Sequence, residues 1–402
     1  MHFQKFWSLL LLPCLLTACA PALTLVAAPT FMPITPTQAS SAQDLFPFKA
    51  ELHYAKAFKV EYHNTYKVVT VLQPWRDANR TFEYILVQRG TPIPANTGNA
   101  EVIEIPVRSI ASLSTTHLPY WAELDQLDKL VAVGNAEYVN TPGVVERLKA
   151  GTIQGVGNGP EVNIEKLLSL QPELVTTLAL GNTNKDDYQQ LLEKGFKVVI
   201  VSDFMEETPL GRAEWVKFMA LFTNQEAQAE AVFEPIEQHY LAIQKLGQSA
   251  KGCPTVVMGF EINGSWNMPG GKNYQGAYIH DAGGCYLWAD DDSTGRIPLS
   301  FEAVYQKAAT AEYWFNQSDS WLNAGDILAA DPRYENFSAF AEGHVYNDNA
   351  RLNTTGGNDY NESGQANPDV ILADLISILH PELLPSHVLV YYRPLNHGAS
   401  QK

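Results

Sequence analysis

From about residue 101 onward, the chain alternates between short apolar segments and amphipathic segments with a helical period. The apolar segments predict buried strands at 102–107, 129–134, 173–179, 196–202, 253–262, 284–289, 312–317 and 344–348. The amphipathic segments predict helices at 118–127, 163–170, 188–195, 209–222, 301–309, 327–337 and 368–380. Such alternation indicates an α/β protein in which helices cover mostly parallel sheets.

One longer helix interrupts this alternation. Apolar residues recur with helical spacing over 224–246, and Thr223-Asn224-Gln225-Glu226 has the pattern of a capping box. Gly247 suits the C-terminal end of this helix, and Pro235 predicts a kink. We therefore expect the following division of the body: an N-terminal lobe at 45–222, a linker helix at 223–250 and a C-terminal lobe at 251–395.

The N-terminal lobe begins with a segment of a different character. Residues 66–72 and 81–88 are β-type and flank the turn-rich stretch PWRDANR, which predicts a hairpin. This β extension occupies 45–100, before the first βα repeat. It carries no motif that points to a function, and we expect it to pack on the first lobe.

The N-terminus has the features of an export signal. An apolar run at 6–19 is shorter than the roughly 20 residues that span a bilayer, so it indicates a signal peptide. Its end, Leu16-Thr17-Ala18-Cys19, resembles the bacterial lipoprotein box, which implies removal of 1–18 and a lipid on Cys19. An ordinary secretory signal is the alternative. Residues 19–44 then form a flexible tether, and the expected location is periplasmic or extracytoplasmic, anchored to the cell membrane.

Charge and cysteine content narrow the partners and the chemistry. The formal net charge is −17, which disfavours nucleic acid and anionic lipid, because both bind clustered Lys and Arg. The body of the chain holds two cysteines, Cys253 and Cys285. In an exported protein they form either a disulfide or two buried thiols, and their spacing leaves both alternatives open.

The two halves share a local pattern. Asn163 and Ser300 are each suited to cap a helix, and each is followed two residues later by a glutamate, Glu165 or Glu302. The helix macrodipole stabilises a carboxylate in the first turn by about 0.3–1 kcal/mol. That effect explains a single glutamate, but it explains the repetition in both halves less well.

On these residues, the chain resembles the substrate-binding proteins of the iron-complex (siderophore) and vitamin B12 class of ABC importers. The resemblance covers about 100–385 and is most specific in NIEKLLSLQPELV, which begins at Asn163. It implies two Rossmann-like lobes joined by a single long helix, with a metal-chelate ligand between them. It also implies that Glu165 and Glu302 dock on a permease dimer, which works with its ATPase. We further expect a monomer without a resident cofactor or metal.

Ligands of such sheets bind outside the carboxyl ends of the parallel strands. In the first lobe this rule selects the following candidates: Ser114, Thr115, Thr116, His117 and Tyr138. Hydroxyls and free N–H groups at a helix start suit an anionic group. Capping of the next helix explains the hydroxyls equally well, and a lone histidine is more often structural.

In the second lobe, the stretch 266–274 combines turn residues with large apolar side chains. Its candidates are Trp266, Met268 and Tyr274, which suit a flat organic ligand. Core packing is the ordinary explanation for such side chains.

Two arginines of the second lobe are further candidates, because arginine binds anionic chelates through paired hydrogen bonds. Arg333 is followed by Tyr334, also a candidate, and Arg351 stands near a glycine-rich stretch. Pairing of Arg333 with Asp331 or Glu335 is the alternative.

Three classes of function remain open at this point. The first is a binding protein for an iron–siderophore or related chelate, with haem and cobalamin as alternatives. The second is an exported hydrolase using Asp281, Asp359 and Glu362, although the chain has no GxSxG or HExxH motif. The third is a tethered structural protein, which the lack of repeats disfavours. The ten histidines are scattered, so a bare-metal carrier is a weaker alternative.

Overall fold

The computed structural model describes residues 43–395. The predicted signal peptide, the lipid site expected at Cys19 and nearly all of the expected tether lie outside these residues. Within the described part, no helix combines the length and the apolar character that crossing a membrane requires.

The β extension forms a four-stranded sheet in the order β1-β2-β3-β4. The predicted hairpin is confirmed, since β2 (Tyr66–Val71) and β3 (Phe82–Gln88) pair antiparallel. β1 (Phe58–Tyr62) adds antiparallel to β2, and β4 (Glu101–Ile105) adds parallel to β3. The extension is therefore larger than the hairpin that the sequence predicts.

The first lobe contains a five-stranded, wholly parallel sheet in the order β7-β6-β5-β8-β9. Its strands are β5 (Ile110–Ser112), β6 (Leu130–Val133), β7 (Gln154–Gly155), β8 (Leu174–Thr177) and β9 (Val198–Ile200). Its helices are α1 (Leu118–Glu123), α2 (Pro142–Lys149), α3 (Ile164–Leu170), α4 (Tyr188–Glu193), α5 (Pro209–Ala213) and α6 (Trp215–Ala220). Strands β5, β8 and β9 are buried throughout, as parallel strands covered on both faces should be.

The second lobe repeats this plan with the order β13-β10-β15-β16-β17, in which β17 alone runs antiparallel. Its strands are β10 (Thr255–Met258), β13 (Cys285–Tyr286), β15 (Tyr313–Asn316), β16 (Val345–Asn347) and β17 (Arg393–Pro394). A small antiparallel sheet adds β11 (Glu261–Ile262), β12 (Ser265–Pro269) and β14 (Arg296–Leu299). The helices are α8 (Tyr274–Asp281), α9 (Phe301–Ala308), α10 (Ala324–Ala330), α11 (Ser338–Ala341), α12 (Ser363–Ala366) and α13 (Pro368–Leu379).

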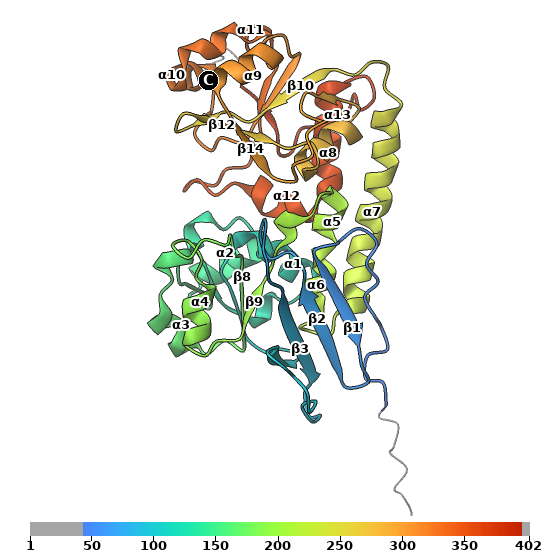
Figure 1. Cartoon of the computed structure of the whole chain (residues 1–402), viewed down its shortest axis with the longest axis vertical. Helices are drawn as coiled ribbons and strands as arrows, with labels where there is room; N and C mark the ends of the chain where they lie inside the picture. Colours follow the sequence, from blue (N-terminus) through green and yellow to red (C-terminus); the bar gives the residue numbers. More distant parts are fainter. Residues whose placement is uncertain (1–42, 396–402) are drawn as a thin grey trace, which may run out of the picture. The chain divides into compact units, whose positions relative to one another are not determined.

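The long helix α7 (Glu226–Gln248) runs beside both lobes (Figure 1). It packs on α6 of the first lobe and on α13 and α8 of the second. The predicted α/β fold with mostly parallel sheets is therefore confirmed.

The capping box predicted at the start of the long helix is not formed. Residue Gln225 occupies the N-cap position without a side-chain cap bond, and Asn224 is left-handed with φ 56°. A buried lysine of the extension accounts for this. Lys67 Nζ donates to Asn224 Oδ1 at 2.8 Å and pairs with Glu226 Oε1 at 2.5 Å. Glu226, the glutamate of the predicted capping box, neutralises Lys67 instead of capping the helix.

Three helix boundaries also differ from the prediction. The helix expected at 209–222 is two helices separated at Glu214, whose carboxylate accepts backbone N–H groups from residues 53–55 of the extension. Helix α7 ends at Gln248, one residue after Gly247, and Gly247 packs so closely on the second lobe that a Cβ there would stand 2.6 Å from the Asp281 carbonyl oxygen. The helix expected at 327–337 ends at Ala330, since Pro332 begins a separate 3-10 turn.

The two body cysteines form a disulfide. Cys253 and Cys285 are bonded, with their Cα atoms 5.2 Å apart. The bond joins the segment before β10 to the neighbouring strand β13. This settles the alternative that the sequence left open.

Candidate functional site

A cavity of about 410 Å³ lies between the two lobes. Its walls come from the loop after β2 in the extension, from the first lobe and from the second lobe. The lining residues are Trp75, Arg76, Leu180, Phe204, Met205, Asn273, Tyr274, Gln275, Thr294, Gly295 and Arg296.

The first-lobe wall stands at the carboxyl edge of its parallel sheet. Leu180 follows β8, and Phe204 and Met205 follow β9. This is the edge at which α/β sheets bind ligands. The cavity therefore occupies the position that the sequence predicts for a ligand, although mostly different residues line it.

The second-lobe wall is the beginning of α8. Asn273 caps this helix, with Oδ1 accepting the Gln275 N–H at 3.0 Å. The N-terminus of a helix favours negative charge. Gln275 is 2% exposed, and its Nε2 has no hydrogen-bond partner among the described residues. A buried amide donor without a partner costs free energy unless a ligand or water accepts from it.

Two guanidinium groups add positive charge to the cavity. Arg76 Nη1 donates to the Arg296 carbonyl oxygen at 3.2 Å, and Arg296 bonds the Asn267 carbonyl and the Gln317 side chain. Among residues 43–395, neither arginine has a carboxylate within ion-pair distance. The site thus combines a helix N-terminus, a buried amide and two cations without neutralising partners.

Tyr274 is the one predicted ligand residue that lines this cavity. Its ring lies under the buried Arg212 guanidinium, 4.1 Å from the ring centroid. Arg212 in turn contacts Asp203 Oδ2 at 3.4 Å. Burial raises the pKa of Asp203, although Arg212 acts in the opposite direction.

The first-lobe candidates serve mainly local roles. Ser114 Oγ and Thr116 Oγ1 bond each other at 2.9 Å, and Thr115 begins a 3-10 turn that ends at His117. His117 is fully buried, its Nδ1 lies 3.2 Å from Thr176 Oγ1, and burial lowers its pKa to about 3. Tyr138 is 45% exposed. None of the five lines the interlobe cavity.

Three second-lobe candidates belong to the core. Trp266 donates its indole N–H to the Met258 carbonyl at 2.8 Å and stacks on Trp314. Met268 is fully buried in the same strand, and Tyr334 packs edge-on against Trp266. These three side chains therefore pack in the core, which is the alternative considered for them from the sequence.

The two candidate arginines are neutralised within the second lobe. Arg333 pairs with Asp331 at 2.6 Å and also approaches Glu302 and Glu261. Arg351 Nε donates to Asp359 Oδ2 at 2.6 Å. Neither lines the interlobe cavity.

Glu165 and Glu302, the two residues expected to dock on a permease, lie in the first turns of helices, one in each lobe. Asn163 caps α3 and Ser300 caps α9, as predicted, through bonds from Lys166 N and Ala303 N. Glu165 is exposed, and the Glu302 side chain is 76% exposed while its Oε1 lies 3.3 Å from Arg333. Helices α3 and α9 stand in different lobes (Figure 1).

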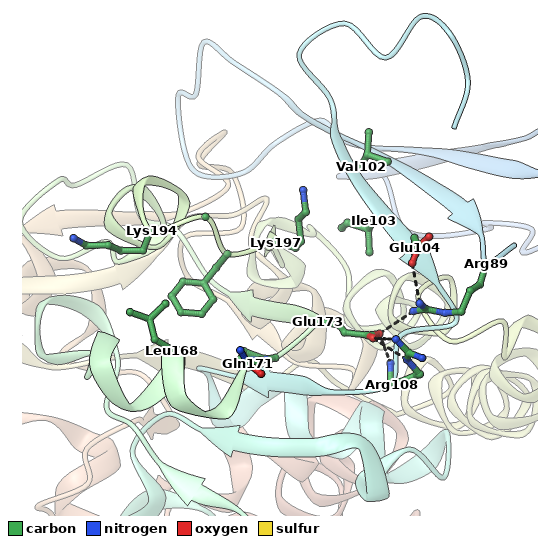
Figure 2. Close-up of a pocket in the computed structure, with 13 residues that line it drawn as sticks. Arg89, Val102, Ile103, Glu104, Arg108, Leu168, Gln171, Glu173, Lys194 and Lys197 are labelled. Atoms are coloured by element: carbon green, nitrogen blue, oxygen red, sulfur yellow. Dashed lines mark hydrogen bonds and ion pairs between the residues drawn. The ribbon is translucent and has the colours of Figure 1, made fainter. Parts of the chain in front are cut away.

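A second cavity of about 410 Å³ opens on the first lobe at the amino ends of β8 and β9. Figure 2 shows Arg89 and Arg108 converging there on Glu173. Arg89 also pairs with Glu104 of β4 at 2.8 Å. These charges neutralise one another and join the extension to the first lobe, which indicates a structural role.

The carboxylates considered for a hydrolase are each engaged in contacts. Asp281 accepts the Tyr240 hydroxyl at 2.7 Å, and Asp359 binds Arg351. Glu362 accepts the Thr141 N–H at 2.7 Å from the other lobe. Burial raises the pKa of Glu362, while these donors act in the opposite direction.

Most of the cavity lining is not evident from the sequence. The turn-rich stretch PWRDANR contains Trp75 and Arg76. An aromatic residue next to an arginine in a turn is the feature of the sequence that could have indicated a ligand contact there. The short runs 204–205 and 294–296 carry no signal, because folding alone brings them to the same place.

The sequence profile of the family described as periplasmic binding protein matches residues 110–352. The chain belongs to this family. The matched segment includes both lobe sheets' central strands and α7, but it excludes the β extension.

Known proteins resemble this periplasmic binding protein along most of its length. An uncharacterized lipoprotein of Methanocaldococcus jannaschii is 25% identical over 79% of this chain and 78% of its own. The structure of a periplasmic heme binding protein from Pseudomonas aeruginosa covers 73% of this chain and 100% of its own, with TM-score 0.54 and 17% identity. An ABC-type Fe3+-hydroxamate transport system structure from Saccharomonospora viridis covers 68% and 94%, with TM-score 0.52 and 14% identity. The structural likenesses show the fold.

Proposed function

We propose that this periplasmic binding protein is an extracytoplasmic, lipid-anchored receptor that captures an iron–siderophore or related metal chelate. It delivers the ligand to the permease dimer of an ABC importer, whose ATPase drives uptake. Haem or a corrinoid is the alternative cargo. In this proposal the signal peptide is removed and Cys19 carries the lipid, in keeping with the lipoprotein name of the archaeal relative.

The observation that carries the proposal is the interlobe cavity. It combines Tyr274 and Trp75, which offer ring surface, with Arg76 and Arg296, which offer positive charge. A ferric chelate with anionic donor groups needs both. Structural relatives described as heme binding and Fe3+-hydroxamate transport proteins support this class of ligand.

We propose that the protein acts as a monomer. Its lobes comprise 45–222 and 251–395, and a linker helix at 223–250 joins them. Glu165 and Glu302 would each contact one permease subunit. Because ion pairs mainly set orientation and association rate, they suit a receptor that must dock repeatedly and leave again.

Direct binding measurements test the proposal. The purified full chain is titrated with ferric enterobactin and protohaemin, which are anionic, and with ferrichrome and cyanocobalamin, which are uncharged. Saturable quenching of tryptophan fluorescence by at least one compound is expected, because Trp75 lines the cavity. A lack of response to all four would contradict the proposal.

A further inference from the structure

The β2–β3 loop of the extension reaches the interlobe cavity from outside the segment that matches the family. Trp75 and Arg76 lie in this loop and line the cavity, whereas the matched segment begins at residue 110. The extension therefore does more than cover the first lobe: it supplies one wall of the cavity.

Packing on the first lobe holds the loop in place. Trp75 packs edge-on against Phe82 and is tilted against Tyr188, with both pairs of ring centroids 6.0 Å apart. Gly181 leaves room for the indole, since a Cβ there would stand 2.6 Å from Trp75 Cδ1. The backbone of Arg76, the next residue, is therefore held in place beside the cavity.

Arg76 spans from this loop to the second lobe. Its Nη1 donates to the Arg296 carbonyl oxygen at 3.2 Å. Its guanidinium covers Gly295 so closely that a Cβ built there would lie 0.9 Å from Nη2. Only a glycine permits this approach, so the sequence of the second lobe accommodates an arginine from the extension.

The groups around Arg76 are suited to an anion. The N-terminal residues of α8 line the same cavity, among them Gln275, whose buried Nε2 has no hydrogen-bond partner among the described residues, and so does Arg296. Acidic residues Asp77 and Glu207 line the adjoining cavity of about 260 Å³ rather than this one. Arg76 lines both cavities, but the charged side chains that line the interlobe cavity are the two arginines, Arg76 and Arg296.

From this geometry we infer that Arg76 is a specificity-determining residue, which selects anionic chelates over uncharged ones by binding an anionic group of the ligand together with Arg296 and the start of α8. This inference rests on the proposed function, and it adds a role in ligand selection for a residue of the β extension. On binding, the Arg76 guanidinium exchanges the Arg296 carbonyl oxygen for an anionic group of the ligand.

The experiment compares variants of the full chain with the same two anionic and two uncharged compounds. Arg76→Gln should weaken binding of an anionic chelate about tenfold or more, because it removes a hydrogen bond between a cationic donor and an anionic acceptor. Binding of uncharged compounds should change less than twofold. Arg76→Lys, which keeps the charge, should recover part of the loss.

Two further variants separate charge from loop structure. Arg80→Gln removes a cation of the same loop that stacks on Phe82 and does not line the cavity, so it should leave every affinity unchanged. Gly295→Ala keeps Arg76 but displaces its guanidinium, so it should reproduce the selective loss.

Each outcome decides the inference. It is overturned if Arg76→Gln weakens anionic and uncharged compounds equally, or weakens neither. If the unaltered chain binds only uncharged compounds, the proposed function stands and the selectivity inference fails. If the unaltered chain binds none of the four, the proposed function itself fails and the inference fails with it.

Discussion

Thr141 in the first lobe donates its backbone N–H to Oε1 of Glu362 in the second lobe at 2.7 Å. The other carboxylate oxygen accepts the N–H of Asn140 at 2.8 Å. Glu362 is 1% exposed, so these donors stabilise a carboxylate that burial alone would disfavour. Glu362 thereby ties the two lobes together, as do the bonds that Asn353 of the second lobe donates to the carbonyl oxygens of Glu137 and Val139.

Glu362→Ala should destabilise this arrangement. The substitution leaves two buried N–H groups without acceptors, which costs about 1–3 kcal/mol for each group that water does not reach. Small-angle X-ray scattering should detect a larger radius of gyration, and thermal denaturation a lower midpoint. The exposed Glu335→Ala is the matched control. An unchanged radius and midpoint would show that the lobes are held by other contacts.

Acid should destabilise the first lobe through His117. Burial lowers its folded-state pKa to about 3, from an ordinary value of 6.5. Stability is therefore complete above pH 6.5 and decreases as the pH falls toward 3, because only the unfolded chain gains the proton in that window. The contribution lost between pH 6.5 and 4 is about 3 kcal/mol.

Urea denaturation at several pH values measures this effect. His117→Gln should flatten the decline in the free energy of unfolding between pH 6.5 and 4, whereas the exposed His280→Gln should not. Parallel declines in the unaltered chain and in His117→Gln would assign the acid sensitivity to other groups.

Glu165→Ala and Glu302→Ala should separate capture from delivery. Both glutamates lie in first helical turns away from the interlobe cavity, so ligand affinity should stay within twofold of the unaltered chain. Uptake by cells or ligand-stimulated ATPase activity of the importer should fall, and fall further in the double variant. The exposed Glu146→Ala is the control. A collapse of ligand affinity would place these residues in binding rather than docking.

Loss of the disulfide should destabilise the second lobe. The bond between Cys253 and Cys285 spans a sequence separation of 32 residues. Closing a loop of this size is worth about 4 kcal/mol in the chain-entropy model. Denaturation of the double variant Cys253→Ala/Cys285→Ala should show this loss, and a reducing agent should reproduce it in the unaltered chain. An equal effect of the reducing agent on the double variant would point to another cause.

Local periodicity was sufficient to predict the fold class. Buried strands such as 196–202 and the long helix near 224–246 carry their signals within a few residues, and both are present in β9 and α7. The helix caps at Asn163 and Ser300 are local as well, and both are confirmed. Predictions of local helix-end structure were wrong where a residue distant in sequence binds a side chain that local rules assign to the helix end. Glu226 pairs with Lys67 instead of closing a capping box, and no local rule contains that pairing.

The sequence by itself therefore determined the α/β class, the two sheets, the connecting helix and the positions of the two exposed glutamates. These features depend on residues that are neighbours along the chain. Only the tertiary structure decided which side chains meet between the lobes. Trp75 and Gly181, or Arg76 and Gly295, are separated by more than a hundred positions, and their proximity is a product of packing. The same packing places Trp266 in the core and leaves Tyr274 at the cavity.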